Sequence, residues 1–253
     1  YDVFFINENI GWSVGFNGLI IKTTDGGSTW FSQTNWSVTT RTLYGVHASD
    51  ANNVWVVGNN ETILKSTNGG DTWTALPAIF SPETSYRAVY FFDANTGFVV
   101  GNRSRIAKTT DGGTTWSIVN APTGTVQLWT IDFNSQGVGL AVGASSQVWR
   151  STDFGNTWTL ITGFPSTSIT FYSGRFGSDN VAYISGGSGY FFKSTDAGLT
   201  WETAGYRFTS QRIRDISFAD NNNGYIVGTN LVARSSDGGK TWTEGVKPYT
   251  GDI

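Results

Sequence analysis

Short apolar runs separated by polar turns recur along the whole chain. The first series reads DVFFI, GWSVG, GLIIKT and TWFSQ, at residues 2–6, 11–15, 18–23 and 29–33. Both faces of these runs are apolar, which is typical of strands in a sheet that is covered on both sides. The segments between them are rich in Asn, Asp and Gly, as tight strand reversals require. The pattern predicts an all-β protein of four-stranded sheets, with no helix of useful length.

An eight-residue signature ends the third run of each series and begins the fourth. It occurs as TTDGGSTW at 23–30, STNGGDTW at 66–73, TTDGGTTW at 109–116, STDFGNTW at 151–158, STDAGLTW at 194–201 and SSDGGKTW at 235–242. Its third residue recurs at steps of 43, 43, 42, 43 and 41 residues, a spacing typical of four-stranded propeller blades. We therefore expect one β-propeller domain over 1–253 with six blades, or seven if the chain belongs to a longer parent. The expected blades are 1–35, 41–78, 86–120, 128–163, 171–205 and 213–245.

The signature itself is interpreted as a structural turn. Its acid can accept backbone N–H bonds, its glycines can adopt positive φ, and its Trp can pack against the strand beside it. Asn replaces the acid in the second copy, which an Asx-type turn tolerates. The expected structural residues are Asp25, Asn68, Asp111, Asp153, Asp196 and Asp237, with Trp30, Trp73, Trp116, Trp158, Trp201 and Trp242.

The repeat register also places six side chains at one end of the innermost strands. Each lies two residues before an apolar position of the first strand in its blade, and six such strands converge on the axis of a propeller. Tyr, Trp and Arg concentrate at this position, and these are the residues enriched at binding hot spots. We call the six residues the rim and expect them to surround the mouth of the channel: Tyr1, Tyr44, Arg87, Trp129, Tyr172 and Arg214.

Further arginines are expected on the same face. Arg103 and Arg105 lie in the turn between the second and third strands of blade three, and Arg212 comes just before a rim position. Arg87, Arg103 and Arg105 should share one sector, a local positive patch suited to a carboxylate. The alternative is that the rim only fills the channel and that its arginines pair with Glu61, Glu83 or Asp215 as ordinary surface charge.

The pattern S/T-x-D-x-G-x-T-W resembles the Asp-box repeats of bacterial neuraminidases. The fuller pattern, G-x-x-V-G followed by I-x-K-T-T-D-G-G-x-T-W, resembles the photosystem II assembly and stability factor family and related exported bacterial propellers. That resemblance implies a non-catalytic propeller whose arginine-rich face receives a protein partner. The residues of this chain that correspond in type to the arginines of that face are Arg87, Arg103, Arg105, Arg212 and Arg214. Blades one, four and five have aromatic residues instead. The same boxes occur in sialidases, xyloglucanases and sortilin-like receptors, so they predict fold better than function.

The composition of the chain limits the classes of partner that we expect it to bind. A net charge of −3 and a pI near 5.1 provide no global basic field, so we expect no nucleic-acid partner. No run of 18 apolar residues exists, so direct membrane insertion is not expected. The absence of Cys excludes disulfides and thiolate chemistry. The start at Tyr1 and the resemblance together make us expect an exported protein, periplasmic, cell-surface or extracellular, whose signal segment is absent from this chain.

Catalytic and metal-binding patterns are sparse. His47 is the single histidine and is interpreted as a packed, hydrogen-bonded neighbour. Asp132 and Asp215 lie on different inner strands, and nothing in their spacing indicates the facing carboxylate pair that a glycosidase needs. The turns 49–53 and 219–223 fit either calcium binding or Asx turns. We therefore expect no enzymatic activity, no bound metal and no cofactor. We predict a propeller that binds a protein or peptide segment or serves as a scaffold. One alternative is a carbohydrate-binding propeller or one like a glycoside hydrolase or sialidase, and another is a purely structural module.

Overall fold

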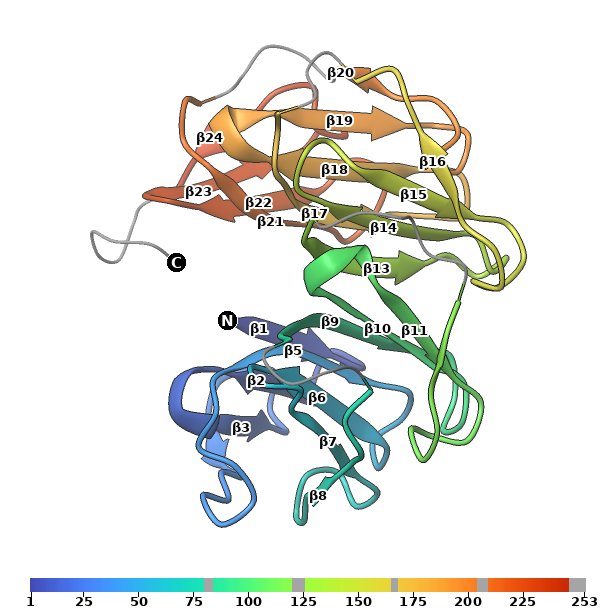
Figure 1. Cartoon of the computed structure of the whole chain (residues 1–253). Coiled ribbons are helices and arrows are strands. Elements are labelled where there is room, and N and C mark those ends of the chain that lie inside the picture. Colours follow the sequence, from blue (N-terminus) through green and yellow to red (C-terminus); the bar gives the residue numbers. More distant parts are fainter. Residues whose placement is uncertain (80–83, 120–125, 165–167, 204–208, 246–253) are drawn as a thin grey trace. The chain divides into compact units, whose positions relative to one another are not determined.

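The computed structural model describes residues 1–79, 84–119, 126–164, 168–203 and 209–245, and the chain divides into two compact units, Tyr1–Ala121 and Pro122–Ile253 (Figure 1). Within these ranges each unit holds three four-stranded antiparallel sheets whose strands follow one another in chain order. This is the all-β, six-bladed β-propeller class that the repeats predict.

Unit 1 contains blades 1 to 3. The strands of blade 1 are β1 Asp2–Phe5, β2 Gly11–Val14, β3 Ile20–Thr23 and β4 Phe31–Ser32. Those of blade 2 are β5 Leu43–Ala48, β6 Val54–Gly58, β7 Ile63–Ser66 and β8 Thr74–Ala75. Those of blade 3 are β9 Tyr86–Phe91, β10 Gly97–Gly101, β11 Ile106–Thr109 and β12 Ser117–Ile118. Short 3-10 turns, η1 Phe16–Gly18 and η2 Asn102–Ser104, join the second and third strands of blades 1 and 3.

Unit 2 contains blades 4 to 6. The strands of blade 4 are β13 Leu128–Phe133, β14 Gly139–Gly143, β15 Val148–Ser151 and β16 Thr159–Ile161. Those of blade 5 are β17 Phe171–Phe176, β18 Ala182–Gly186, β19 Phe191–Ser194 and β20 Glu202–Thr203, with η3 Gly187–Gly189 between β18 and β19. Those of blade 6 are β21 Ile213–Phe218, β22 Gly224–Gly228, β23 Leu231–Ser235 and β24 Thr243–Glu244.

The hydrophobic cores lie between blades. One core joins Trp12 and Val14 of blade 1 to Val54 and Val56 of blade 2. Equivalent cores join blades 2 and 3, blades 4 and 5, and blades 5 and 6. The second strands β6, β10, β14 and β18 are buried along their whole length, which explains why both of their faces are apolar in the sequence. Among the described residues, no helix is long and apolar enough to cross a membrane.

Candidate functional site

Five of the six rim residues occupy β-bulges in the inner strands, and the sixth, Tyr1, lies directly before β1. In β5 the pairing with β6 passes from Leu43 to Gly45, which leaves Tyr44 as the extra residue. The same shift isolates Arg87, Trp129, Tyr172 and Arg214. A bulged residue leaves the regular alternation of its strand, so its side chain can be aimed independently of the core. The bulge therefore provides the local reason why large and charged side chains are accommodated in these buried strands.

A repeated glycine faces each bulge. A Cβ atom on Gly143, at the end of β14, would overlap the backbone carbonyl oxygen of Gln127. Gly58, Gly101, Gly186 and Gly228 make the corresponding close approach to the residue before the inner strand of their own blade. Glycine inside a strand pattern often marks such a close backbone approach. The sequence contains this signal as a glycine at the end of the second strand in blades 2 to 6, and directly after that strand in blade 1.

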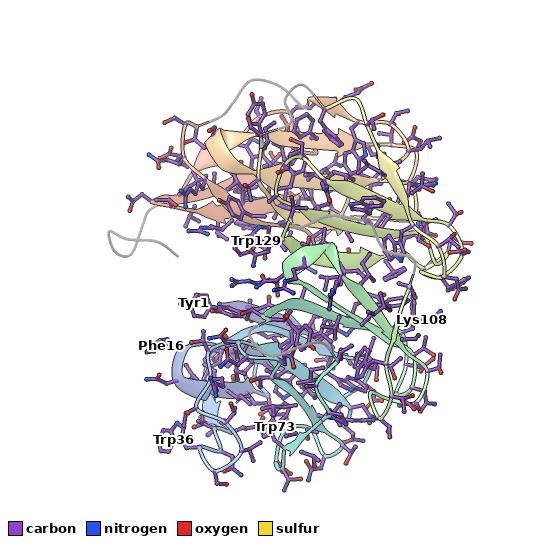
Figure 2. All side chains as sticks on the ribbon, viewed as in Figure 1. Tyr1, Phe16, Trp36, Trp73, Lys108 and Trp129 are labelled. Carbon is purple, nitrogen blue, oxygen red and sulfur yellow. The ribbon has the colours of Figure 1, made fainter. Side chains whose placement is uncertain are left out.

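Three consecutive rim residues contact one another in unit 1. The rings of Tyr1 and Tyr44 meet edge to face, with centroids 5.4 Å apart at an angle of 71°. The Arg87 guanidinium lies over the Tyr44 ring, 4.0 Å from its centroid. Burial lowers the pKa of Arg87, and the neighbouring Tyr44 opposes that shift. The three side chains therefore form one continuous row, and Tyr1, at its blade 1 end, is labelled in Figure 2.

The rim of unit 2 repeats this row. The rings of Trp129 and Tyr172 lie edge to face, with centroids 5.3 Å apart at an angle of 67°, and Trp129 is labelled in Figure 2. The Arg214 guanidinium lies over the Tyr172 ring, 5.1 Å from its centroid. Each unit thus brings its predicted rim residues together. That all six encircle one opening stays a prediction.

The other predicted arginines lie at the same end of their blades. Arg103 is exposed in η2 and adopts φ 64°. Because Gly101 pairs with Tyr86, η2 begins beside the bulge that holds Arg87. Arg105 is half-buried and interacts electrostatically with Glu61, and Arg212 is exposed immediately before β21. Glu61, a buried acid in the turn between β6 and β7 of blade 2, is therefore a counter-charge to the predicted positive sector of blade 3; Glu83 lies outside the described residues.

Polar side chains further along the inner strands bind the backbone of the next inner strand, and the sequence predicts only some of these contacts. The backbone N–H of Phe91 donates to His47 Nδ1 at 3.3 Å, and the imidazole packs between Phe4 and Tyr90, which confirms the packed, hydrogen-bonded role predicted for it. In unit 2, the N–H of Phe176 donates to Asp132 Oδ2 at 2.8 Å. These side chains satisfy edge N–H groups of the next inner strand, which would otherwise lack partners.

Arg175 links the two inner-strand acids of unit 2. Its Nε lies 4.0 Å from Asp215 Oδ1, and its charge also favours the ionised form of Asp132, whose pKa is raised mainly by burial. Ser173 Oγ donates to Asp215 Oδ1 at 2.6 Å. Sequence reasoning named both acids and missed Arg175, whose signal was a charged residue inside an inner strand.

The boxes form closed networks of hydrogen bonds at the other end of the third and fourth strands. In blade 1, the Thr29 N–H donates to Asp25 Oδ1 at 2.8 Å and the Thr29 hydroxyl donates to Oδ2 at 2.6 Å. The Thr23 hydroxyl donates to Asp25 at 2.8 Å and accepts from the Gly27 N–H at 2.9 Å. The same bonds recur around the four other box acids: Asp111, Asp153, Asp196 and Asp237.

Asn68 keeps this network with one bond reversed. Its Oδ1 accepts from the Thr72 N–H at 2.9 Å, as an aspartate would. Its Nδ2 donates to the Thr72 hydroxyl at 3.0 Å, whereas a carboxylate can only accept from that hydroxyl. The turn therefore forms with or without a negative charge.

We expect the box acids to make stability fall on acidification, and Asp111→Asn to weaken that fall. Hydrogen bonds from Thr115 lower the pKa of Asp111 to about 2, and an unfolded aspartate titrates at about 3.9. A lowered folded-state pKa stabilises the protein above about pH 4, and the contribution is lost as the pH falls towards about 2. Urea unfolding at a series of pH values between these limits measures the slope. Asn68→Asp is the matched reverse change and should steepen it; equal slopes in both variants would contradict the expectation.

The turns considered for calcium are occupied by their own hydrogen bonds. Asp50 Oδ1 accepts from the N–H groups of Asn52 and Asn53, both at 2.8 Å, and Asp220 binds Asn222 and Asn223 in the same way. These are Asx turns. No group of three or more His, Cys, Asp or Glu side chains suited to a metal ion is found in the parts of the chain that are described.

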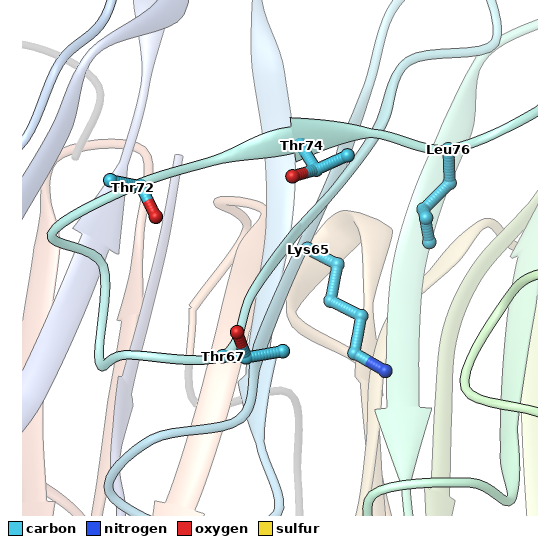
Figure 3. A pocket seen from close by; sticks show the side chains of 5 residues that line it. All are labelled: Lys65, Thr67, Thr72, Thr74 and Leu76. Carbon is cyan, nitrogen blue, oxygen red and sulfur yellow. The ribbon is translucent and has the colours of Figure 1, made fainter.

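A shallow pocket of about 210 Å³ lies on the box side of blade 2 (Figure 3). Its lining consists of Lys65, Thr67, Thr72, Thr74 and Leu76. Lys65 packs over the Trp55 ring, 5.0 Å from its centroid. The lining contains no acid, and the pocket is at the opposite end of the blade from the rim bulge, so it adds nothing to the rim.

Comparisons with known proteins give one family match. The model described as photosynthesis system II assembly factor YCF48 matches residues 1–82 and 79–165. A solved YCF48 bound to a D1 peptide is 23% identical with a TM-score of 0.76, over 96% of this chain and 79% of that one. YCF48 from Cyanidioschyzon merolae is 22% identical with a TM-score of 0.75, over 100% and 86%. An ancestral GH74 enzyme is 14% identical with a TM-score of 0.73, over 96% and 37%. No curated protein sequence matches the chain.

Proposed function

Because the chain belongs to the photosynthesis system II assembly factor YCF48 family, we propose that it is a non-catalytic propeller that binds a protein or peptide segment. The rim and the neighbouring arginines Arg103, Arg105 and Arg212 form the binding surface. The observation that carries this proposal is the row of stacked aromatic and arginine side chains in each unit. Rigid aromatics and arginines of this kind dominate protein-binding hot spots. A related YCF48 is known in complex with a D1 peptide, which supports a peptide as the class of partner.

The recognised group is a carboxylate or another planar anion beside an apolar side chain. Arginine donates two parallel N–H bonds to a carboxylate, while its flat face stacks on an aromatic ring. Arg87 over Tyr44 and Arg214 over Tyr172 both have this stacked arrangement. We also infer that the chain acts in an exported compartment, which rests on the resemblance to exported propellers alone.

A glycan is the second candidate ligand, because Tyr1 and Trp129 offer rings on which sugars can stack. A glycosidase role has less support. Such an enzyme needs two carboxylates placed on either side of the bond that it breaks. Asp132 and Asp215 instead share the charge of Arg175 and bind the groups around them.

Removing Arg87 and Arg214 together should weaken capture of the protein partner by at least about 100-fold. Each lost charge-assisted contact is worth about 1.5–3 kcal/mol, and about 1.4 kcal/mol corresponds to tenfold in affinity. The measurement compares capture from native extract by the wild-type chain and by the Arg87→Ala/Arg214→Ala variant. Arg234→Ala is the matched control, because Arg234 is exposed on β23 and pairs with Tyr225 away from the bulge.

Trp129→Ala separates the two candidate ligands. A glycan ligand detected on a glycan array should lose most of its signal in this variant and keep it in the arginine variant. A peptide ligand should show the reverse order. If neither variant changes any binding, the rim only fills the channel and the proposed function is wrong.

A further inference from the structure

The order of rim residues is duplicated between the two units. Blades 1 to 3 present an aromatic residue, a tyrosine and an arginine, and blades 4 to 6 present the same sequence of types. Trp129 follows Tyr1 by 128 residues, Tyr172 follows Tyr44 by 128, and Arg214 follows Arg87 by 127. The spacing corresponds to three blades. The repeat of single blades does not require this. It places a residue at each rim position, but it does not require the residue types to recur in the same order every three blades.

The geometry is duplicated as well. The ring centroids of the two aromatics are 5.4 Å apart in unit 1 and 5.3 Å apart in unit 2, at angles of 71° and 67°. In each unit the guanidinium lies over the ring of the central tyrosine. Bulges position the tyrosine and the arginine in both units. The two units therefore contain the same arrangement of an aromatic residue, a tyrosine and an arginine, and in both units β-bulges position the tyrosine and the arginine.

Each copy has the chemistry of a complete small subsite. Stacking on tyrosine engages the flat face of a guanidinium, whereas a carboxylate is recognised by its in-plane N–H groups. The tyrosine thus fixes the plane in which the arginine presents its donors. The outer aromatic, Tyr1 or Trp129, adds an apolar surface along the same row for the side chain next to that carboxylate.

We propose that each unit carries its own carboxylate subsite, so that one chain binds two peptide carboxylates, each flanked by an aromatic or aliphatic side chain. The inference rests on the proposed function, because both subsites belong to the binding surface described above. It adds a stoichiometry of two and a defined chemical group for each subsite.

The two subsites differ in surrounding charge. In unit 1, Arg103 and Arg105 lie at the same end of blade 3 as Arg87, Glu61 is buried and interacts with Arg105, and Asp2 follows Tyr1 directly in the chain. In unit 2, Arg212 accompanies Arg214, and Asp215 follows directly in the chain. Asp215 is engaged by Ser173 at 2.6 Å and by Arg175 at 4.0 Å. Because their charged neighbours differ, the two subsites should bind the same carboxylate with different affinities.

The test follows the Nε–Hε NMR signals of arginine in the intact chain. The probe is acetyl-Gly-Phe with a free C-terminal carboxylate, and its C-terminal amide is the control ligand. Arg87→Gln and Arg214→Gln assign the two signals, with Arg87→Lys and Arg214→Lys as charge-preserving variants should either Gln variant fail to fold. We expect both signals to shift saturably with the acid and not with the amide.

The single variants decide between one site and two. Arg87→Gln should weaken binding at its own subsite by at least about tenfold while the Arg214 signal still titrates with its dissociation constant unchanged within about twofold, and Arg214→Gln should do the converse. If only one arginine responds, or if either variant abolishes both responses, the two-subsite inference is overturned and the proposed function stands. If neither arginine responds while the glycan array gives a Trp129-dependent signal, the proposed function falls with it.

Discussion

Trp55→Ala should lower the free energy of unfolding by about 4 kcal/mol, because truncating a buried Trp costs about 3–5 kcal/mol. Trp55 is fully buried and stacks on Phe91 of the next blade, with ring centroids 3.6 Å apart at an angle of 6°. Its Nε1–H donates to the carbonyl oxygen of Gly112 in the next Asp box at 3.1 Å. The alanine variant loses all of these interactions and leaves a cavity. Urea unfolding followed by far-UV circular dichroism measures the difference.

Two control variants separate the contributions. Trp55→Phe keeps a ring against Phe91 and removes the N–H donor, so it should cost about 1–2 kcal/mol for the lost hydrogen bond. Trp36→Ala removes a Trp that is 71% exposed and should stay within about 0.5 kcal/mol of wild type. A loss below about 1 kcal/mol in Trp55→Ala would show that the blades are not held together at this contact.

The same contact explains how the boxes stabilise the units. Trp12 Nε1 and Lys22 Nζ of blade 1 both donate to the carbonyl oxygen of Gly69 in the box of blade 2, at 3.0 and 2.9 Å. Lys193 reaches Gly238 of the next box in the same way, at 3.1 Å. A box therefore closes its own turn and also presents a carbonyl group to the preceding blade. Mutations in a box should for this reason weaken packing between two blades.

Most of the fold could be predicted from local signals. The blade strands follow from short apolar runs, and the turns follow from Asn, Asp and Gly, since both depend on residues that are close in sequence. The box networks were also predictable, because Asp25 and Thr29 are only four residues apart and Asn68 supports an Asx turn. Blade count followed from the spacing of the signature.

The geometry of the rim was harder to predict from the sequence. A bulge adds one residue to a strand, and the alternation of apolar residues over six positions is too short to reveal it. Five of the predicted rim positions coincide with the bulges, yet the stacking of Arg87 on Tyr44 depends on two neighbouring strands 43 residues apart. The link from Arg175 to Asp215 was missed for the same reason, since it joins two blades.

Gly143→Ala should destabilise the protein by about 2 kcal/mol and weaken ligand binding at the rim. Its Cβ would overlap the Gln127 carbonyl oxygen and lie 3.0 Å from the Leu128 Cα, and both neighbours are backbone that can yield only by moving the strand. Forcing extra atoms into a packed site typically costs about 1–3 kcal/mol. The displaced backbone is the bulge that carries Trp129, so the row of Trp129 and Tyr172 should be disturbed as well. Urea unfolding measures the first effect and the probe titration measures the second.

Gly15→Ala is the matched control, because Gly15 holds the same repeat position in blade 1, directly after β2. There the nearest neighbour of an added Cβ is a Leu19 side-chain atom at 3.6 Å, an ordinary contact. The backbone at Gly15 is extended, with φ −165°, and alanine reduces the freedom of the unfolded chain, so this variant should be neutral or more stable by up to about 1 kcal/mol. Equal losses in the two variants would mean that the glycine serves the strand and not the bulge, and the account of how the rim is aimed would fail.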